Sequence, residues 1–229
     1  MKKFYFVFLI SCFSLTIISC GLNWGSKKDD TNSGLFVSVG NSGTIIISSD
    51  GITWIFSTSG TSSNLWGINY GNSTFVTVGD SGIILTSSDG TSWDNRTSDV
   101  SSTLYGVTYG NSTFVTVGDN GTILTSSDGT TWTSRTSNTS KNLYGVIYGN
   151  STFVTMGGSG TILTSSDGTS WTSRTSGASD TLWGVIYGKS AYVVVVGTLG
   201  TVLTSSDLTT WTSRTSNTSN NLLEVTYKE

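Results

Sequence analysis

The residues that could carry catalytic chemistry are few in this chain, and one of the commonest types is missing. Its 229 residues contain no histidine, two cysteines and two glutamates, Glu224 and Glu229. Without histidine the chain cannot form a Ser-His-Asp triad, a Cys-His pair or an imidazole metal site. Glycoside hydrolysis would need two carboxylates that flank the scissile bond. Glu224 replaces a recurrent glycine, and we interpret it as sequence drift; a catalytic or ligand carboxylate is the alternative.

Five aspartates recur within one short motif, Ser-Ser-Asp-Gly-x-x-Trp, in which Leu208 replaces the glycine of the last copy. These aspartates are Asp50, Asp89, Asp128, Asp167 and Asp207. An aspartate accepts hydrogen bonds from the amides just ahead of it, and glycine supplies the positive φ of a tight hairpin. Five equivalent carboxylates cannot form an asymmetric catalytic pair. One carboxylate per turn supplies too few oxygen ligands to favour Ca²⁺ binding. We therefore interpret them as structural turn residues and expect no metal and no cofactor.

The spacing of these motifs reveals a repeat that covers most of the chain. The motif tryptophans are separated by 39, 39, 39 and 40 residues: Trp54, Trp93, Trp132, Trp171 and Trp211. The extra residue falls between Tyr187 and Asp207, and we interpret it as a β-bulge in one strand. A fixed period of about 40 residues is typical of propeller blades.

One unit of the repeat contains four short runs rich in β-branched and aromatic residues. In the third unit these runs are residues 104–109, 113–117, 122–126 and 131–135. Gly, Asn, Asp and Ser clusters separate them, and no helical periodicity is present. Each unit is therefore predicted to form one four-stranded blade.

The two ends of the repeat predict how the ring closes. The first unit begins with residues 35–39, which match a second strand, and the chain ends with residues 221–227, which match a first strand. Residues 35–229 number 195, five times the repeat. We therefore predict an all-β fold, a five-bladed β-propeller over residues 34–229. Its C-terminal strand is expected to pair with the N-terminal blade, which removes both exposed sheet edges.

The first residues have the three parts of a secretory signal: Lys2 and Lys3, an apolar run over residues 4–18, and a short segment that ends at Cys20. The apolar run is shorter than the roughly 20 residues of a membrane-spanning helix. Residues 17–20, Ile-Ile-Ser-Cys, resemble the bacterial lipobox. This resemblance implies cleavage before Cys20 and diacylation of its sulfur. An ordinary signal peptide is the alternative.

This leader divides the chain into a signal peptide over residues 1–19, a lipidated flexible tether over residues 20–33 and the propeller over residues 34–229. Cys12 leaves with the leader, so the mature chain keeps Cys20 alone and forms no disulfide. A multi-chain lipid anchor attaches a protein stably to a membrane. We expect localisation at the bacterial cell envelope, at the outer membrane or cell surface rather than the inner membrane.

The aspartate motif is similar to the Asp-box of sialidase-like (BNR) propellers, although it has one residue fewer between Asp and Trp. The units also resemble those of bacterial lipoprotein propellers and photosystem II assembly-factor propellers. The resemblance covers all five units and implies the fold more than any activity. A sialidase would use three arginines that converge on one carboxylate. The arginines here recur three residues after the tryptophan, at Arg96, Arg135, Arg174 and Arg214. They fall on outermost strands, where charge discourages sheet-to-sheet pairing.

Binding is the function that the repeat favours. Loops at one face of a propeller surround the mouth of its channel, and this face is expected to carry Asp99, Lys141 and Asp180. The candidate ligand mouth consists of Trp66, Tyr105, Tyr144, Trp183, Asp80 and Asp119. Aromatic rings with polar neighbours suit sugar rings and protein hot spots alike. Packing of these rings between blades is the alternative.

The predicted function is that of a membrane-anchored, non-catalytic propeller that binds a protein or glycan partner. The alternatives are a multivalent lectin with one weak sugar site per blade and a degenerate sialidase-like hydrolase. With 11 basic and 14 acidic residues the chain lacks the basic surface that nucleic acid needs. We expect a monomer attached to the membrane through its lipid.

Overall fold

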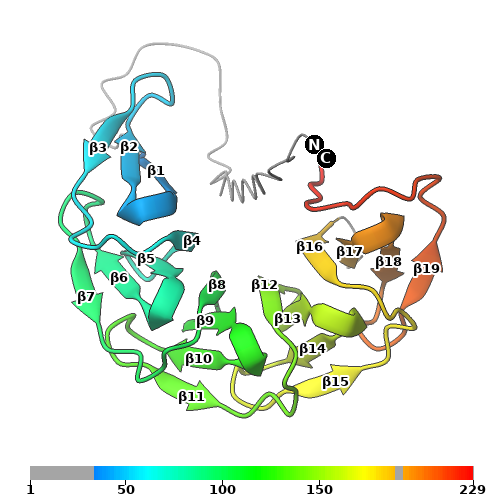
Figure 1. The fold of residues 1–229 in the computed structure, drawn as a ribbon. Helices are drawn as coiled ribbons and strands as arrows, with labels where there is room; N and C mark the ends of the chain where they lie inside the picture. The colour runs from blue at the N-terminus through cyan, green and yellow to red at the C-terminus, as the bar shows by residue number, and fades with distance from the viewer. Residues whose placement is uncertain (1–33, 189–192, 229) are drawn as a thin grey trace, which may run out of the picture.

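The computed structural model describes residues 34–188 and 193–228, which form five antiparallel sheets around a central axis (Figure 1). The predicted five-bladed β-propeller is therefore confirmed. The predicted leader, Cys20 and the tether lie outside the described residues. Within the described ranges, no helix is long and apolar enough to cross a membrane.

The blades follow one another along the chain. Blade 1 consists of β1 (Phe36–Val39), β2 (Ile45–Ser48) and β3 (Ile55–Ser57). Blade 2 consists of β4 (Leu65–Gly71), β5 (Thr74–Gly79), β6 (Ile84–Ser87) and β7 (Asp94–Arg96). Blade 3 consists of β8 (Leu104–Gly110), β9 (Thr113–Gly118), β10 (Ile123–Ser126) and β11 (Thr133–Arg135). Blade 4 consists of β12 (Leu143–Gly149), β13 (Thr152–Gly157), β14 (Ile162–Ser165) and β15 (Thr172–Arg174). Blade 5 consists of β16 (Leu182–Tyr187), β17 (Val193–Gly197), β18 (Val202–Ser205) and β19 (Thr212–Arg214).

In blades 2 to 5 the innermost strands are β4, β8, β12 and β16, and the outermost are β7, β11, β15 and β19. The two middle strands are rich in Val, Ile and Thr, which suit strands that are buried on both faces. In blade 3 these strands, β9 and β10, are almost entirely buried. The hydrophobic core therefore lies between blades, where for example Val76 of blade 2 packs with Phe114 and Trp132 of blade 3.

A single 3-10 turn links the two middle strands of every blade. The turns are η1 (Asn41–Gly43), η2 (Asp80–Gly82), η3 (Asp119–Gly121), η4 (Gly158–Gly160) and η6 (Thr198–Gly200). The middle residue of each turn has a positive φ, which serine, asparagine or glycine adopts more easily than a bulky residue. It is Ser or Asn in four blades, but Leu199 in blade 5, with a φ of 54°.

Replacing Leu199 by asparagine is expected to raise the free energy of unfolding by about 1 kcal/mol, because asparagine tolerates this left-handed conformation. The Leu199 side chain is 63% exposed, so little packing is lost. Leu208 also has a positive φ, of 61°, but its side chain is buried. Leu208→Gly should therefore destabilise the protein. Denaturant unfolding of both variants measures the difference, and a loss of stability in Leu199→Asn would contradict the prediction.

The ring is open at one point, between blade 1 and blade 5 (Figure 1). In blades 3 and 4, which have a neighbouring blade on both faces, the Phe and Trp of the repeat are buried, as Phe114 and Trp132 are in blade 3. The equivalent residues of blade 1 are Phe36 and Trp54, which are 44% and 36% exposed. Within the described residues, blade 1 therefore has an apolar face that no neighbouring blade covers.

The C-terminal segment, residues 221–228, docks on blade 5. The amide of Leu222 donates to the carbonyl of Gly197 at 2.9 Å. A Cβ added to Gly184 would lie 2.9 Å from Cα of Glu224. The innermost strand of blade 3 packs on blade 2 in the same way, since a Cβ on Gly67 would lie 2.7 Å from the carbonyl oxygen of Tyr105. The segment thus lies on blade 5 where the innermost strand of a following blade would lie, as a fifth segment after β4, β8, β12 and β16.

The predicted pairing of this segment with the N-terminal blade is not formed in the structure. Of the described strands, β1 pairs with β2 alone, so the sheet of blade 1 has three strands, and residues 215–228 form no strand. The physical reason is that the C-terminal segment is held by blade 5, while β1 lies across the opening (Figure 1). In the part of the chain that the structure describes, β1 and residues 221–228 therefore face the opening without pairing to each other.

The predicted β-bulge between Tyr187 and Asp207 is wrong. Strand β17 pairs with β18 in unbroken register, from Val193 opposite Ser205 to Val196 opposite Val202. Tyr187 pairs with Val193, as Tyr70 pairs with Phe75 in blade 2. The extra residue therefore belongs to the connection between β16 and β17, where an insertion does not disturb the ladder.

Candidate functional site: the aromatic mouth

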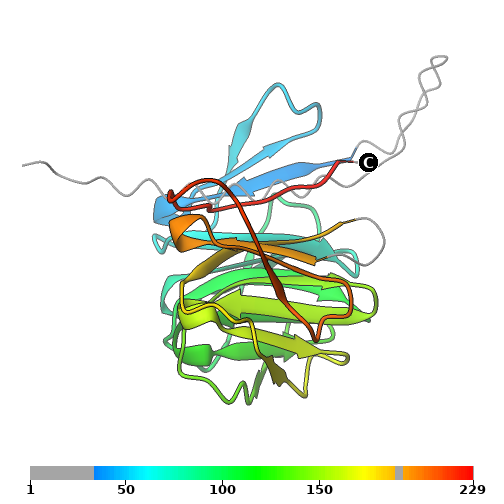
Figure 2. The ribbon, with the colours of Figure 1, turned by 90° about the vertical axis from the view of Figure 1, so that its right-hand side faces the viewer.

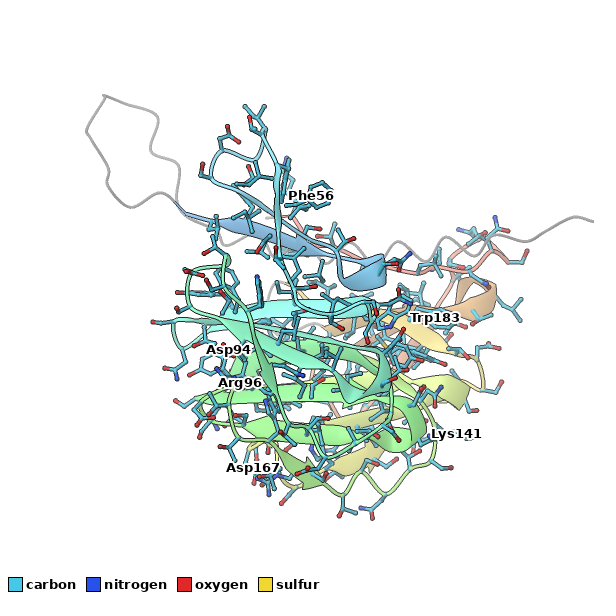
Figure 3. The ribbon with its side chains drawn as sticks, turned by 60° about the vertical axis from the view of Figure 1, so that its left-hand side comes forward. Phe56, Asp94, Arg96, Lys141, Asp167 and Trp183 are labelled. Atoms are coloured by element: carbon cyan, nitrogen blue, oxygen red, sulfur yellow. The ribbon has the colours of Figure 1, made fainter. Side chains whose placement is uncertain are left out.

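The predicted mouth aromatics, which are Trp66, Tyr105, Tyr144 and Trp183, come together at one end of the innermost strands. Their rings form a continuous row, with centroids 6.2 Å, 5.3 Å and 4.5 Å apart in that order. All four side chains are half-buried. In Figure 3, Trp183 and Lys141 lie toward one face of the ring, and Asp167 lies toward the other. The mouth is therefore opposite the face that carries the aspartate turns.

A β-bulge holds each mouth aromatic out of its sheet. The pairing of the innermost strand skips one residue between a leucine and a glycine in each of blades 2 to 5, as between Leu104 and Gly106 in blade 3. The skipped residue is the aromatic one, Tyr105 in this case. Because a bulge redirects the side chain of its extra residue, the rings point out of the sheets and meet each other. The following glycine is the one sequence signal for this feature.

The polar partners of the mouth aromatics come from the 3-10 turns. Trp66 donates its indole N–H to Oδ1 of Asp80 at 2.6 Å, and Asn64 donates its amide to Oδ2 at 2.9 Å. Tyr105 donates its hydroxyl to Asp119 at 2.9 Å. Burial of the Tyr105 ring, with the hydrogen bond to this carboxylate, raises the pKa of Tyr105. The structure thus brings the six predicted mouth residues together, and four of them form two aromatic–acceptor pairs, Trp66 with Asp80 and Tyr105 with Asp119.

Blades 4 and 5 depart from this pattern. In blade 5, Trp183 donates to the hydroxyl of Thr198 at 3.2 Å. In blade 4 the acceptor position is Gly158, and among the described side chains none accepts a hydrogen bond from Tyr144. A Cβ added to Gly158 would have no atom closer than 3.9 Å. The mouth is therefore asymmetric, with fixed carboxylates at blades 2 and 3 and open space beside Tyr144.

The remaining charges predicted for this face contribute less to the mouth. Lys141 is exposed, and Cβ of Lys141 is the side-chain atom nearest to the open space at Gly158. Asp180 accepts a hydrogen bond from the Thr201 hydroxyl at 3.2 Å, so its carboxylate is engaged by blade 5. Asp99 is exposed in the loop that precedes blade 3.

The mouth is a row of half-buried rings on one face of the propeller. A hollow of about 460 Å³ does occur in the described residues, but it lies in blade 1 and is lined by residues 42–45 and 56–62. It shares no lining residue with the mouth. Within the described residues, no three carboxylate or cysteine side chains gather closely enough to hold a metal ion. An open row of rings suits an extended ligand better than a small one enclosed on all sides.

The five motif aspartates organise turns at the opposite face. Asp128 accepts hydrogen bonds from the amides of Thr130 and Thr131 at 2.8 Å and 3.0 Å, and from the Ser126 hydroxyl at 2.9 Å. The same serine oxygen accepts the amide of Gly129 at 2.8 Å. These bonds recur in the other four motifs, with Leu208 in the glycine position of the last.

These hydrogen bonds predict an acid-labile fold. Hydrogen bonds from the backbone amides, and for Asp128 chiefly from the Thr130 hydroxyl, lower the pKa of all five aspartates. The unfolded chain, whose aspartates titrate near about 3.9, then takes up protons first as the pH falls. The stabilisation is therefore complete above about pH 5 and is lost progressively below about pH 4.

Urea unfolding at several pH values measures this dependence. Asp128→Asn should make the loss of stability with falling pH less steep, because one of the five carboxylates no longer titrates. Asp94→Asn is the control, since Asp94 is exposed and paired only with Arg96. A stability that stays constant between pH 5 and pH 2 would contradict the prediction.

The residues considered for catalysis do not converge. Each repeated arginine lies on an outermost strand and donates its Nε to a threonine of the adjacent strand, as Arg135 does to Thr125 at 2.8 Å. Glu224 lies on the C-terminal segment, where desolvation raises its pKa and its carboxylate accepts the amide of Val225 at 3.2 Å. The arginine arrangement does not resemble a converging triad.

No family model and no curated protein matches the chain. Among solved structures it is similar to YCF48 bound to D1 peptide, with a TM-score of 0.64 and 18% identity over 81% of this chain and 64% of that one. It is also similar to YCF48 from Cyanidioschyzon merolae, with a TM-score of 0.53 and 18% identity over 67% and 57% of the two chains. The chain thus spans less than two thirds of the length of both structures. At this identity the likeness concerns the fold, and it supports the β-propeller architecture.

Proposed function

We propose that the protein is a lipid-anchored, non-catalytic propeller that binds an extended segment of a protein partner at its aromatic mouth. The observation that carries the proposal is the continuous row of four half-buried rings, each directed out of its sheet by a bulge. Partly exposed Trp and Tyr are the residues that most often dominate protein interfaces. A solved structure of the same fold, YCF48, has a D1 peptide bound, which supports a peptide as the class of ligand.

The geometry of the mouth favours one ligand over several equivalent ones. A lectin with one site per blade would need the same surroundings in every blade. Here the rings of Tyr105 and Tyr144 touch, and the acceptors differ between blades. A single extended chain that crosses several blades uses such an asymmetric surface better than five separate sugars.

Selection from a displayed peptide library on the immobilised protein tests the proposal. We expect enriched peptides that the protein without its mouth aromatics no longer retains. A glycan array is the parallel test for the lectin: binding of a sugar at each blade, with no peptide enriched, would contradict the proposal. Turnover of a fluorogenic glycoside that Glu224→Gln abolishes would instead support a hydrolase.

Anchoring through Cys20 is a separate part of the proposal. Cys20→Ala is expected to move the protein from the membrane fraction to the soluble fraction, because acylation of this sulfur supplies the anchor. Cys12→Ala is the matched control and should leave the protein in the membrane fraction. Failure of labelled fatty acid to enter the wild-type protein would contradict this part without affecting the peptide test.

A further inference from the structure

The outermost strand of blade 1 differs from every other outermost strand. Ile52, Ile55 and Phe56, together called the apolar patch, are 84%, 59% and 83% exposed. The positions equivalent to Ile52 are Thr91, Thr130, Thr169 and Thr209. Those equivalent to Ile55 are Asp94, Thr133, Thr172 and Thr212, and those equivalent to Phe56 are Asn95, Ser134, Ser173 and Ser213. Four blades therefore serve as internal controls for the fifth.

Closure of the ring would leave the apolar patch exposed. Blade 3 has neighbours on both faces, yet its equivalent residues Thr130, Thr133 and Ser134 are exposed. The patch therefore faces outward from the rim whether or not blade 5 covers blade 1. Figure 2 shows the β2–β3 hairpin projecting beyond the other blades, and Figure 3 shows Phe56 on it, away from Asp94 and Arg96 of blade 2.

The apolar patch also lacks the charge of the other outermost strands. The arginine position of the repeat is Ser57 in blade 1, and the Ser57 hydroxyl donates to the carbonyl of Gly90 at 2.9 Å. The acidic position, Asp94 in blade 2, is Ile55 here. An uncharged rim of Ile and Phe can enter an apolar phase without the cost of desolvating a charge.

The apolar patch adjoins the point where the N-terminal segment joins the propeller. A Cβ added to Gly51 would lie 3.6 Å from the ring of Phe36, so the turn with Ile52 is next to the start of β1. The rings of Phe36 and Trp54 lie 6.4 Å apart. The chain from Cys20 to Leu35 spans at most about 50 Å when fully extended. A lipid on Cys20 would therefore tether the propeller to the membrane through the end of blade 1 that carries the apolar patch.

We propose that the apolar patch docks on the lipid bilayer and orients the propeller on its membrane. The inference rests on the anchoring part of the proposed function. A single aromatic and two aliphatic side chains at the headgroup level add a second attachment point to the lipid. With two points fixed, the rim of blade 1 lies on the bilayer and the propeller no longer turns freely about its tether.

The test uses the mature, acylated protein with an environment-sensitive fluorophore on one introduced cysteine. Thr53→Cys places the probe beside the apolar patch, and Thr131→Cys places it in the same turn of blade 3. Both threonines are exposed. In phosphatidylcholine vesicles the emission of the probe at residue 53 is expected to shift to shorter wavelength, and that at residue 131 should not. The same probe is then placed in a variant that also carries Ile52→Thr, Ile55→Thr and Phe56→Ser, which are the residue types of blade 3 at these positions. These substitutions should abolish the shift.

The outcomes separate this inference from the anchoring proposal. Acylated, vesicle-bound protein with no shift at residue 53 overturns the docking inference and leaves anchoring intact. If the protein takes up no fatty acid, the lipid anchor is refuted, and the emission of the probe at residue 53 is then measured with added vesicles. A shift in emission supports docking of the apolar patch on the bilayer, and the absence of a shift contradicts it. A shift without vesicles, in protein that sediments as a dimer, assigns the patch to a second copy and overturns membrane docking. An unchanged urea midpoint verifies that the triple variant is folded.

Discussion

Replacing Gly118 by alanine is expected to lower the free energy of unfolding by about 3 kcal/mol, the upper part of the usual range for overpacking. A Cβ on Gly118 would overlap the backbone carbonyl of Thr103, which directly precedes β8, the innermost strand of the same blade. That carbonyl accepts the amide of Asp119 at 2.9 Å, so it cannot move without losing a hydrogen bond. The φ of Gly118 is −166°, which alanine adopts freely, so the cost comes from the clash.

Gly40 provides a matched control at the same position of blade 1. Its φ of −170° is similar, and a Cβ there would meet no atom within 4 Å. The reason is that blade 1 lacks an innermost strand. Gly40→Ala is therefore expected to leave the free energy of unfolding nearly unchanged. Urea unfolding of the two variants measures the contrast.

The same pair of variants reports on the opening in the ring. If residues 221–228 completed blade 1 in solution, Asn221 would stand where Thr103 stands in blade 3. Gly40→Ala would then cost as much as Gly118→Ala, and the open ring would be contradicted. Equal tolerance of both substitutions would contradict the packing of the innermost strands.

The second large effect concerns the mouth. Tyr144→Ala is expected to weaken binding of a selected peptide about 30-fold, which corresponds to the loss of about 2 kcal/mol at an interface hot spot. Tyr144 is at the centre of the row, with neighbouring ring centroids at 5.3 Å and 4.5 Å, and it lies beside the open space at Gly158. Its removal breaks the row in two. Titration calorimetry with the selected peptide measures the change.

Phe56→Ala is the control for this experiment, because Phe56 is an exposed aromatic residue on β3, the outermost strand of blade 1, whereas the mouth aromatics lie on innermost strands. Its affinity for the peptide should equal that of the wild type. Unchanged binding by Tyr144→Ala would show that the peptide binds elsewhere. A second substitution, Gly158→Asp, should also weaken a peptide that uses the open space, since the carboxylate would restore the pattern of blades 2 and 3.

Much of the fold follows from the repeat. The period, the turn residues and the β-rich runs predict five blades, because each unit must bury the same face against the next. The site is partly predictable for the same reason: equivalent positions such as Trp66 and Tyr105 must lie at one end of the ring. Their contact with each other depends on the bulges, and alternation within residues 104–109 does not reveal a skipped residue.

Other features follow from departures from the repeat, and these are harder to predict. The extra residue before Val193 lengthens the repeat by the same amount whether it lies in a strand or in a turn. The sequence therefore does not locate it, and only the register of β17 in the structure distinguishes the two positions. The position of residues 221–228 depends on whether their contact with Gly184 or a pairing with β1 prevails, and both suit the sequence. The apolar patch is detectable in the sequence, by comparing Phe56 with Ser134 and its equivalents.

The docking of each innermost strand on the preceding blade also determines the order in which the molecule can assemble. The amide of Leu65 donates to Gly40 of blade 1, and that of Leu222 donates to Gly197 of blade 5. Each innermost strand thus packs on the blade that precedes it in the chain. The residues in contact are therefore separated by only a short stretch of sequence. A chain that is synthesised from its N-terminus can therefore fold one blade at a time, each against a blade that has already folded. Contacts of this kind form quickly, whereas the contact between β1 and the C-terminus would join the most distant parts of the propeller and form last.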